Sequence, residues 1–262
     1  MTIGTADKLR LRMHNLRFGY TQGYLCGMLV KGLARLKTGL LHVLGQRCIA
    51  CLFPTIEQPC PYCAAQIRTL PMPSYNYDLR NWPRVAQSIR PHLLAPLHVT
   101  CEYSYPFSHW IAELKLQGKL FYIAPLARLF SAGVKSRPKQ LPDLILPAPM
   151  HFSRYLKRQF SHTRELTIAI GKQLNVPVLD SGLVKTRLSP PQRTLSRADR
   201  LMNMDNSFAC KSFEPSVKRV AIFDDVVTTG ATMQAMLNAV RATNPHIELE
   251  VWSLAITLPR VD

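Results

Sequence analysis

The segment from Val220 to Met233, VAIFDDVVTTGATM, limits the possible folds of this chain more than any other. An apolar run, typical of a buried strand, stops at Asp224 and Asp225 and turns through Thr-Thr-Gly directly into a helix-forming sequence. The first turn of a helix attracts anions, because its N–H groups are unpaired and the helix dipole is positive there. Gly230 lets the backbone approach such an anion closely. Since carboxylates bond sugar hydroxyls or Mg²⁺, the segment predicts a pocket for a ribose 5-phosphate.

A second interpretation is a buried strand that meets a helix, with the acids as N-terminal caps. One acid would be enough for a cap, so the second acid and the Thr-Thr-Gly turn favour a ligand. The segment also resembles, residue by residue, the phosphoribosyl pyrophosphate (PRPP) binding motif of type I phosphoribosyltransferases. The resemblance implies that both acids face the ribose hydroxyls, that the loop holds the 5-phosphate, and that Mg²⁺ accompanies PRPP. The residues it assigns to PRPP are Asp224, Asp225, Val226, Val227, Thr228, Thr229, Gly230, Ala231 and Thr232.

Four cysteines upstream form a second motif, C-x2-C-x8-C-x2-C. Each CxxC turn presents two thiolates, and two such turns close together suit a tetrahedral metal ion. We expect structural Zn²⁺, with disulfides, free thiols and an iron site of rubredoxin type as the alternatives. The N-terminal residues do not read as a cleaved secretory signal, so we expect a reducing cytosol, where disulfides are rare. The four ligands would be Cys48, Cys51, Cys60 and Cys63.

The composition adds a strong positive charge. The chain has 262 residues, of which 47% are hydrophobic, and this allows one large domain and a small module. No stretch of the sequence is long and uncharged enough to span a membrane. The formal net charge of +17 favours a polyanionic partner, such as nucleic acid, nucleotides or an anionic membrane surface. Residues 151–219 are strongly basic, and in a doubly wound fold they would rim the same cleft as the motif.

Strand and helix patterns alternate in the second half of the chain. Apolar runs predict strands within 143–150, 176–187, 217–223 and 249–257, and helical patterns fall within 151–174 and 231–242. This alternation predicts an α/β fold with a doubly wound parallel sheet. Upstream, residues 70–96 form a Pro-rich link, and residues 103–130 predict two helices broken at Gly118, with Lys115 and Lys119 solvated.

Residues 24–45 carry apolar positions at helical spacing and a basic face, which predicts an amphipathic helix. It would pack against the zinc module or touch the inner face of a membrane. Met28 is an alternative start to Met1. We expect three divisions: a basic helix and zinc module in 1–69, a link and helical lead-in in 70–141, and an α/β domain in 142–262.

The order of these parts is similar to that of the ComF family, in which a four-cysteine zinc module precedes a domain like the type I phosphoribosyltransferases. The similarity covers roughly residues 28–260. One departure is the segment Arg158-Gln159-Phe160-Ser161-His162, which stands where the family usually shows Arg-Gly-Phe-Asn. The residues expected at the pyrophosphate or at DNA are Arg154, Lys157, Arg158, Arg187, Gln192, Arg193, Arg197 and Arg200.

ComF-like proteins belong to the machinery of natural transformation. The resemblance therefore implies a cytoplasmic competence protein that binds PRPP, single-stranded DNA and a helicase, with Tyr105, Tyr155 and Phe160 as candidate platforms for stacked bases. The competing hypothesis is an active phosphoribosyltransferase that moves ribose 5-phosphate from PRPP to a base. The sequence contains the motif that would hold the ribose phosphate and the cations that would bind pyrophosphate. It shows no additional segment (the hood of a phosphoribosyltransferase) that would recognise the base. A third hypothesis is zinc-dependent nucleic-acid binding with an inactive pocket.

Overall fold

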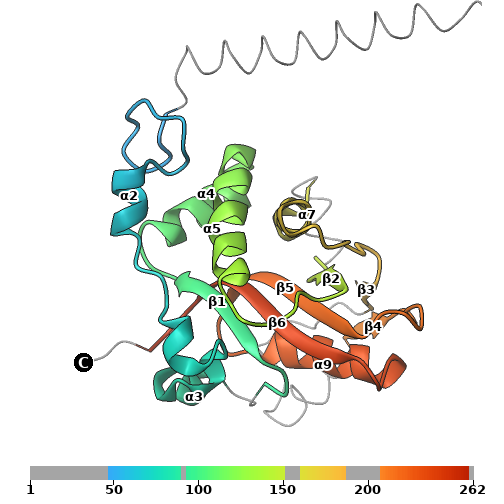
Figure 1. The fold of residues 1–262 in the computed structure, drawn as a ribbon. Helices are drawn as coiled ribbons and strands as arrows, with labels where there is room; N and C mark the ends of the chain where they lie inside the picture. The colour runs from blue at the N-terminus through green and yellow to red at the C-terminus, as the bar shows by residue number, and fades with distance from the viewer. Residues whose placement is uncertain (1–46, 90–92, 151–159, 187–206, 260–262) are drawn as a thin grey trace, which may run out of the picture. The chain divides into compact units, whose positions relative to one another are not determined.

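The computed structural model describes residues 47–89, 93–150, 160–186 and 207–259 (Figure 1). The chain divides into two compact units, Met1–Ala64 and Ala65–Asp262. The amphipathic helix expected within 24–45 lies outside the described residues. Among the helices that are described, none combines the length and the apolar character needed to cross a bilayer.

The larger unit is built on a parallel sheet of four strands in the order β1-β6-β5-β2. A separate antiparallel pair is formed by β3 and β4. The strands are β1 (Leu97–Glu102), β2 (Leu144–Pro147), β3 (Leu183–Lys185), β4 (Phe208–Cys210), β5 (Arg219–Val227) and β6 (Glu248–Ile256). Strands of a parallel sheet are covered on both faces, which explains why β2, β5 and β6 read as nearly continuous apolar runs.

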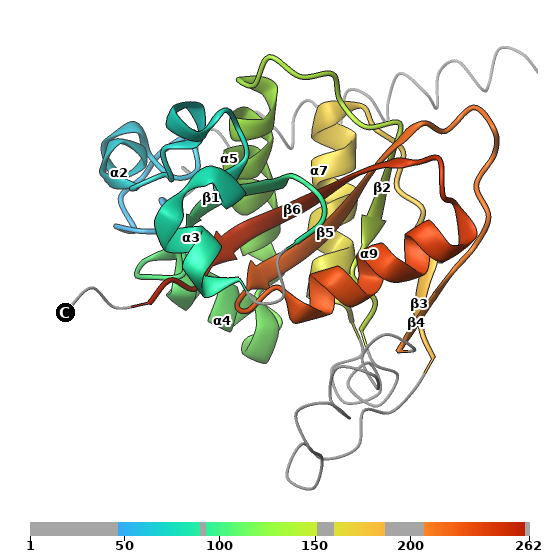
Figure 2. The ribbon, with the colours of Figure 1, turned by 90° about the horizontal axis from the view of Figure 1, so that it is seen from below.

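Helices cover both faces of this sheet, which confirms the doubly wound α/β fold class. Figures 1 and 2 show α5 and α7 on one face and α9 and α3 on the other. Local signals set several ends: Gly118 ends α4 with a φ of 65°, and the Ser161 hydroxyl accepts the Arg164 N–H at the start of α7. The helices are α2 (Pro61–Gln66), α3 (Pro83–Ser88), α4 (Phe107–Gln117), α5 (Ile123–Lys135), α7 (His162–Leu174) and α9 (Ala231–Thr243), with 3₁₀ turns η1 (Met72–Tyr75), η2 (Leu79–Asn81) and η3 (Leu120–Tyr122).

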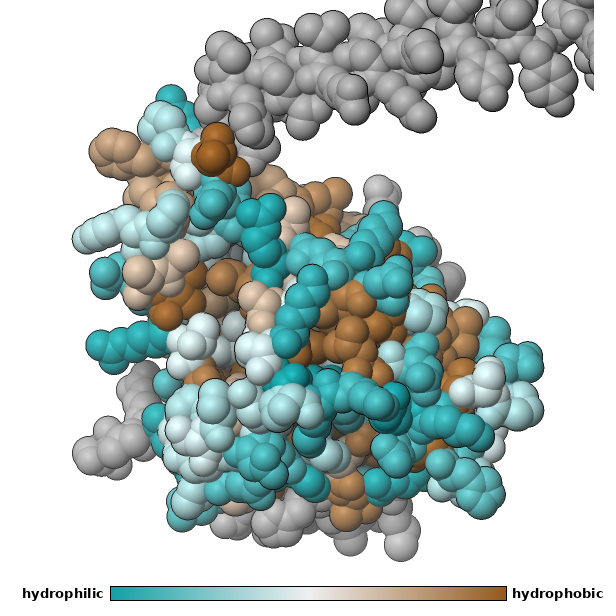
Figure 3. Space-filling view, viewed as in Figure 1, coloured by the Kyte–Doolittle hydropathy of each residue, from teal (hydrophilic) through white to brown (hydrophobic). Residues whose placement is uncertain are grey.

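Each face of the sheet has its own apolar core. Aliphatic residues of α3, α9 and the strands pack together on one face. On the other, the ring of Phe130 in α5 meets Phe223 of β5 at 5.3 Å and Trp252 of β6 at 5.5 Å between centroids. Figure 3 shows mostly hydrophilic side chains on the surface of the larger unit in this view, with hydrophobic ones in smaller patches between them. The two cores hold β5 and β6 in the centre of the unit.

Several expected elements are confirmed. The helix expected within 231–242 is α9, the strand expected within 249–257 is β6, and the two helices broken at Gly118 are α4 and α5. No pattern in the sequence indicated β1, because His98 and Thr100 interrupt its apolar run. The prediction that the strand of the motif stops at the acids was wrong. The pairing of β5 with β6 continues to Val227.

His98 of β1 is buried on the face of the sheet that α5 covers, and it is neutral there. It is 2% exposed, its ring meets Phe130 edge-on at 5.5 Å, and neither ring nitrogen has a hydrogen-bond partner among the described residues. Burial, helped by the positive charges of Arg137 and Lys139, lowers the pKa of His98 from 6.5 to about 3. Folding therefore keeps this imidazole neutral at pH values where the unfolded chain binds a proton.

We expect His98 to make the larger unit sensitive to acid. Because the folded pKa is below the unfolded value, the stability that the neutral ring provides is complete above pH 6.5 and is lost as the pH falls toward about 3. The slope can reach about 1.4 kcal/mol per pH unit. Urea unfolding followed by the fluorescence of the buried Trp110 and Trp252 should show this slope in the wild type and a flatter one in His98→Leu. A control, His109→Gln, changes an exposed histidine and should keep the wild-type slope; equal slopes in all three proteins would contradict the assignment.

Candidate functional site

The acid pair lies inside β5, near its carboxyl end. Asp224 is opposite Ser253 of β6, and the pairing continues to Val227 opposite Ile256. Successive residues of a strand point to opposite faces of the sheet. The two carboxylates differ in burial, since Asp225 is 3% exposed and Asp224 is partly exposed, although they are neighbours in sequence.

Asp225 is buried against two basic side chains from different helices. Its Oδ2 lies 2.7 Å from Nζ of Lys115 in α4 and 3.1 Å from Nε2 of His162 in the first turn of α7. The side chains of Asp225 and His162 are each 5% exposed, and that of Lys115 is 28% exposed. Burial opposes ionisation, but His162 and the charge of Lys115 outweigh it and hold the pKa of Asp225 well below its usual range. Asp225 is thus an ionised group that is already paired.

Asp224 has the opposite electrostatic character. It is partly exposed, and its Oδ1 accepts the backbone N–H of Asp225 at 2.9 Å. Desolvation and the neighbouring charge of Asp225 raise the pKa of Asp224 well above its usual range. A raised pKa favours the protonated carboxyl group, which can both donate and accept a hydrogen bond, as a sugar hydroxyl can.

The loop after β5 leads directly into α9. Thr228 and Thr229 are exposed, and Gly230 precedes the first helical residue, Ala231. The first turn of α9 leaves N–H groups without partners inside the helix, and α9 is long enough for its dipole to favour an anion there. The threonine hydroxyls and the N–H groups of the first turn of α9 thus gather at the carboxyl end of β5, where the Thr229 hydroxyl accepts the N–H of Ala231 at 3.5 Å.

Gly230 is required for packing as well as for its backbone conformation. Its φ is +79°, and a Cβ added to it would lie 2.6 Å from Cγ2 of Ile89, the residue that follows α3. The sequence had suggested that this glycine lets the backbone approach an anion. The space that a side chain would need is instead filled by Ile89 and Leu93. A residue with a Cβ would push the loop away from its support.

The basic residues that the structure places near the acid pair differ from those expected from the sequence. The prediction that Lys115 is solvated was wrong, because it pairs with the buried Asp225, whereas Lys119 pairs with Glu113 and its side chain stays 41% exposed. The sequence pattern missed His162 as a site residue, although it sits in the segment that departs from the family pattern. The cations and the glutamine expected at pyrophosphate or DNA lie outside the described residues; they are Arg154, Lys157, Arg158, Arg187, Gln192, Arg193, Arg197 and Arg200.

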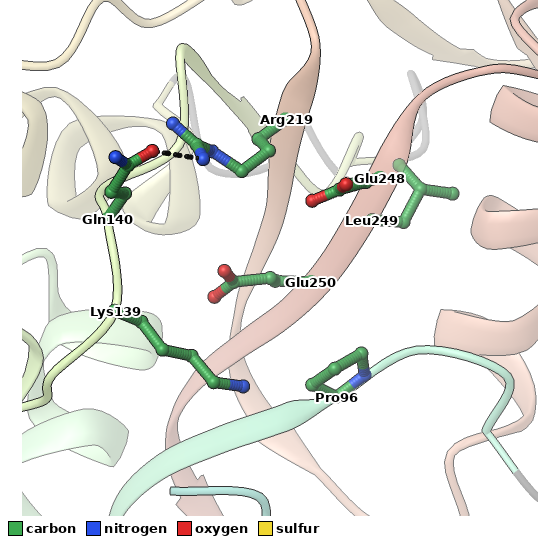
Figure 4. Close-up of a pocket in the computed structure, with 7 residues that line it drawn as sticks. All are labelled: Pro96, Lys139, Gln140, Arg219, Glu248, Leu249 and Glu250. Atoms are coloured by element: carbon green, nitrogen blue, oxygen red, sulfur yellow. Dashed lines mark hydrogen bonds between the residues drawn. The ribbon is translucent and has the colours of Figure 1, made fainter.

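A cavity of about 430 Å³ lies at the other edge of the sheet (Figure 4). It is lined by residues at or just before the amino ends of the strands: Pro96, Lys139, Gln140, Arg219, Glu248, Leu249 and Glu250. Its acids and bases are mixed, and Glu250 already pairs with Arg137 and accepts the Trp252 Nε1–H. In open α/β sheets, ligands bind at the carboxyl ends of the strands. The β5–α9 turn is therefore the better candidate site.

The smaller unit contains a candidate metal centre. The Sγ atoms of Cys48, Cys51, Cys60 and Cys63 lie within 4.8 Å of one another, and those of Cys51 and Cys60 are 3.8 Å apart. Four sulfurs at about 2.3 Å from a tetrahedral Zn²⁺ are separated by about 3.8 Å from each other. The arrangement fits a metal ion such as Zn²⁺, and thiolate ligands are typical of a structural zinc site.

Backbone N–H groups support thiolates in this cluster. Ala50 and Cys60 donate to Sγ of Cys48 at 3.4 and 3.3 Å, and Cys63 donates to Sγ of Cys60 at 3.5 Å. Burial of Cys48 opposes ionisation, but the N–H donors outweigh it and lower the pKa of that thiol to about 6. The N–H groups around Cys48 thus favour the ionised form of this thiol, which is the form that binds metal.

We expect the isolated protein to carry one Zn²⁺ per chain and Cys60→Ser to lose it, because a structural site needs all four thiolates. Elemental analysis of protein prepared without chelator measures this. Cys210→Ser is the matched control, because burial raises the pKa of Cys210 to about 11 and that thiol lies in the larger unit. Wild-type protein without zinc, or Cys60→Ser that retains it, would contradict the assignment.

Comparison with solved structures finds weak likeness to phosphoribosyltransferases. The xanthine-guanine-hypoxanthine phosphoribosyltransferase of Helicobacter pylori matches with a TM-score of 0.34 and 10% identity, over 63% of this chain and 89% of that one. The adenine phosphoribosyltransferase of Leishmania donovani matches with a TM-score of 0.36 and 10% identity, over 60% and 83%. Scores this low are no evidence of a shared activity.

Comparison of sequences is more informative, although no family model matches the chain. Competence protein F of Haemophilus influenzae is 31% identical over 159 residues, which are 58% of this chain and 69% of that protein. DNA utilization protein YhgH of Escherichia coli K12 is 28% identical over 166 residues, which are 62% of this chain and 72% of that protein. The similarity indicated by the order of the motifs is thus confirmed, and the chain belongs to the competence protein F, or ComF, family.

Proposed function

We propose that this protein is a competence protein that binds single-stranded DNA and PRPP during the uptake of DNA. The observation that carries the proposal is the β5–α9 turn, where an acid pair, exposed threonines and the N–H groups of the first turn of α9 meet. The names of the two relatives, competence protein F and DNA utilization protein, support the same process. The net charge of +17 supports a polyanionic partner.

PRPP suits the chemistry of this turn. Its 5-phosphate would bind the N–H groups of the first turn of α9 and the hydroxyls of Thr228 and Thr229. Its ribose hydroxyls would bond Asp224, the partly exposed acid of the pair. Mg²⁺ belongs to the proposal as the companion of the pyrophosphate, whose oxygens are the hard ligands that this ion prefers.

The DNA contact is assigned to basic residues beyond those that the structure describes. Near the acid pair, the described cations already have acidic partners: Lys115 pairs with Asp225, Lys119 with Glu113, and Arg164 with Asp180 and Glu165. A strand backbone needs cations that are available to exchange their counterions. We therefore assign the phosphate contacts to the set that contains Arg154, Arg158, Arg193 and Arg197.

The remaining parts of the proposal come from the sequence. The metal of the cysteine cluster is Zn²⁺ in a structural role, and the protein works in the cytoplasm. We also propose that the protein binds a helicase and makes a peripheral contact with the inner face of the membrane.

Affinity for single-stranded DNA should fall steeply as the salt concentration rises, because bound phosphates release condensed counterions. Replacing Arg154, Arg158, Arg193 and Arg197 with alanine should weaken binding to all sequences alike. It should also reduce the slope of the logarithm of affinity against the logarithm of salt concentration by about 0.7 for each phosphate that is no longer neutralised. Electrophoretic mobility shifts at several salt concentrations, with two unrelated oligonucleotides, measure both effects.

A control variant removes the same formal charge from exposed positions elsewhere, at Arg128, Lys135, Lys139 and Lys172. It should keep most of the wild-type affinity. Binding that is indifferent to salt and to the first set of substitutions, or weakened equally by both sets, would refute a specific contact. Formation of a nucleotide from PRPP and a base, without DNA binding, would instead identify an active phosphoribosyltransferase.

A further inference from the structure

The surroundings of Asp225 bear on what the proposed PRPP site requires. One oxygen of this carboxylate, Oδ2, faces both Lys115 Nζ at 2.7 Å and His162 Nε2 at 3.1 Å. The two partners come from α4 and α7, so two helices converge on a single residue of β5. Removing one partner of a buried ion pair leaves an uncompensated charge, which is strongly unfavourable.

A divalent cation does not fit at this oxygen as well. Mg²⁺ requires near-ideal octahedral coordination at about 2.0–2.1 Å and usually keeps several waters. Asp225 is only 3% exposed, which leaves little space for that hydration shell. The positive charge of Lys115 would also repel a second cation at this distance. To bind a metal ion, Asp225 would have to release Lys115.

Asp224 is placed differently. It is partly exposed, and it precedes a loop whose Thr228 and Thr229 are exposed. Its Oδ1 accepts the N–H of Asp225, which fixes the orientation of the carboxyl group. One acid of the pair thus meets the solvent, while the other anchors two helices.

We infer that Lys115 is the resident cation of the acid pair, and that the site holds the ribose 5-phosphate part of its ligand without a metal ion at Asp225. This inference rests on the proposed function. It makes the sugar phosphate itself the unit that is recognised, whether free or as a part of PRPP. Lys115 is then a positioning residue: it acts through Asp225 and ties α4 to the strand that carries the ligand-binding turn.

The test is calorimetric titration with ribose 5-phosphate, which lacks the pyrophosphate that would bring its own Mg²⁺. Buffer freed of metals with a chelating resin is compared with the same buffer containing millimolar MgCl₂; a dissolved chelator is avoided because it would strip the cysteine cluster. For the wild type, the dissociation constants in the two buffers should agree within about twofold.

Variants of α4 then test the role of Lys115. Lys115→Gln should weaken binding roughly tenfold or more in metal-free buffer, because Asp225 loses its neutralising partner. Added Mg²⁺ should restore part of that affinity, and Lys115→Arg should retain binding. Lys119→Gln is the matched control, because Lys119 is just beyond α4 and pairs with Glu113 instead. Thermal unfolding of each variant reports whether the fold is kept.

The outcomes separate the inference from the proposed function. Wild-type binding that needs Mg²⁺ would overturn the inference and leave the proposed function standing; this comparison depends on no variant. Affinity of Lys115→Gln equal to that of the wild type and of Lys119→Gln would also overturn it. An absence of ribose 5-phosphate binding in both buffers would overturn the proposed function together with the inference.

Discussion

The parallel pairing of β5 with β6 is the constraint on which the site depends. It continues past both acids to Val227, so both acids are held within a strand, where Asp225 is buried and Asp224 is partly exposed. The same pairing fixes where α9 begins, and with it the position of the N–H groups at the carboxyl edge. Two adjacent, identical side chains thus differ in burial, and their pKa values are shifted in opposite directions.

Asp225 also connects elements that are far apart in sequence. Lys115 reaches it from α4 and His162 from α7. The same two segments meet a second time at Gly118, where an added Cβ would lie 3.2 Å from Cε1 of Phe160. The ends of α4 and α7 are therefore fixed relative to the β5–α9 turn. The basic residues 151–159 lie between β2 and this junction in sequence, which is why we assign some of their cations to the same ligand or to DNA.

Local signals in the sequence were sufficient for part of this account. The two CxxC turns and the acid pair with Thr-Thr-Gly are short patterns whose chemistry is set by neighbouring residues, and Gly118 marked a helix end that the structure confirms. The sequence could not reveal β1, because His98 and Thr100 hide a strand that only burial on both faces explains. Nor could it reveal the partners of Asp225, since Lys115 is far away in the chain and looks like any solvated lysine. The reason for Gly230 was equally hidden, because Ile89 approaches it only in the folded protein.

Hydrogen–deuterium exchange of the backbone amides, with and without PRPP, tests most directly the claim that the ligand binds at the β5–α9 turn. The account predicts slower exchange in peptides that span Thr228–Met233, and unchanged exchange in peptides that span Glu248–Glu250 at the amino edge. Asp224→Ala should remove the protection. Asp143→Ala should retain it, because Asp143 accepts the N–H groups of Lys218 and Arg219 at the other edge of the sheet. Protection confined to the amino edge, or unchanged protection in Asp224→Ala, would contradict the account.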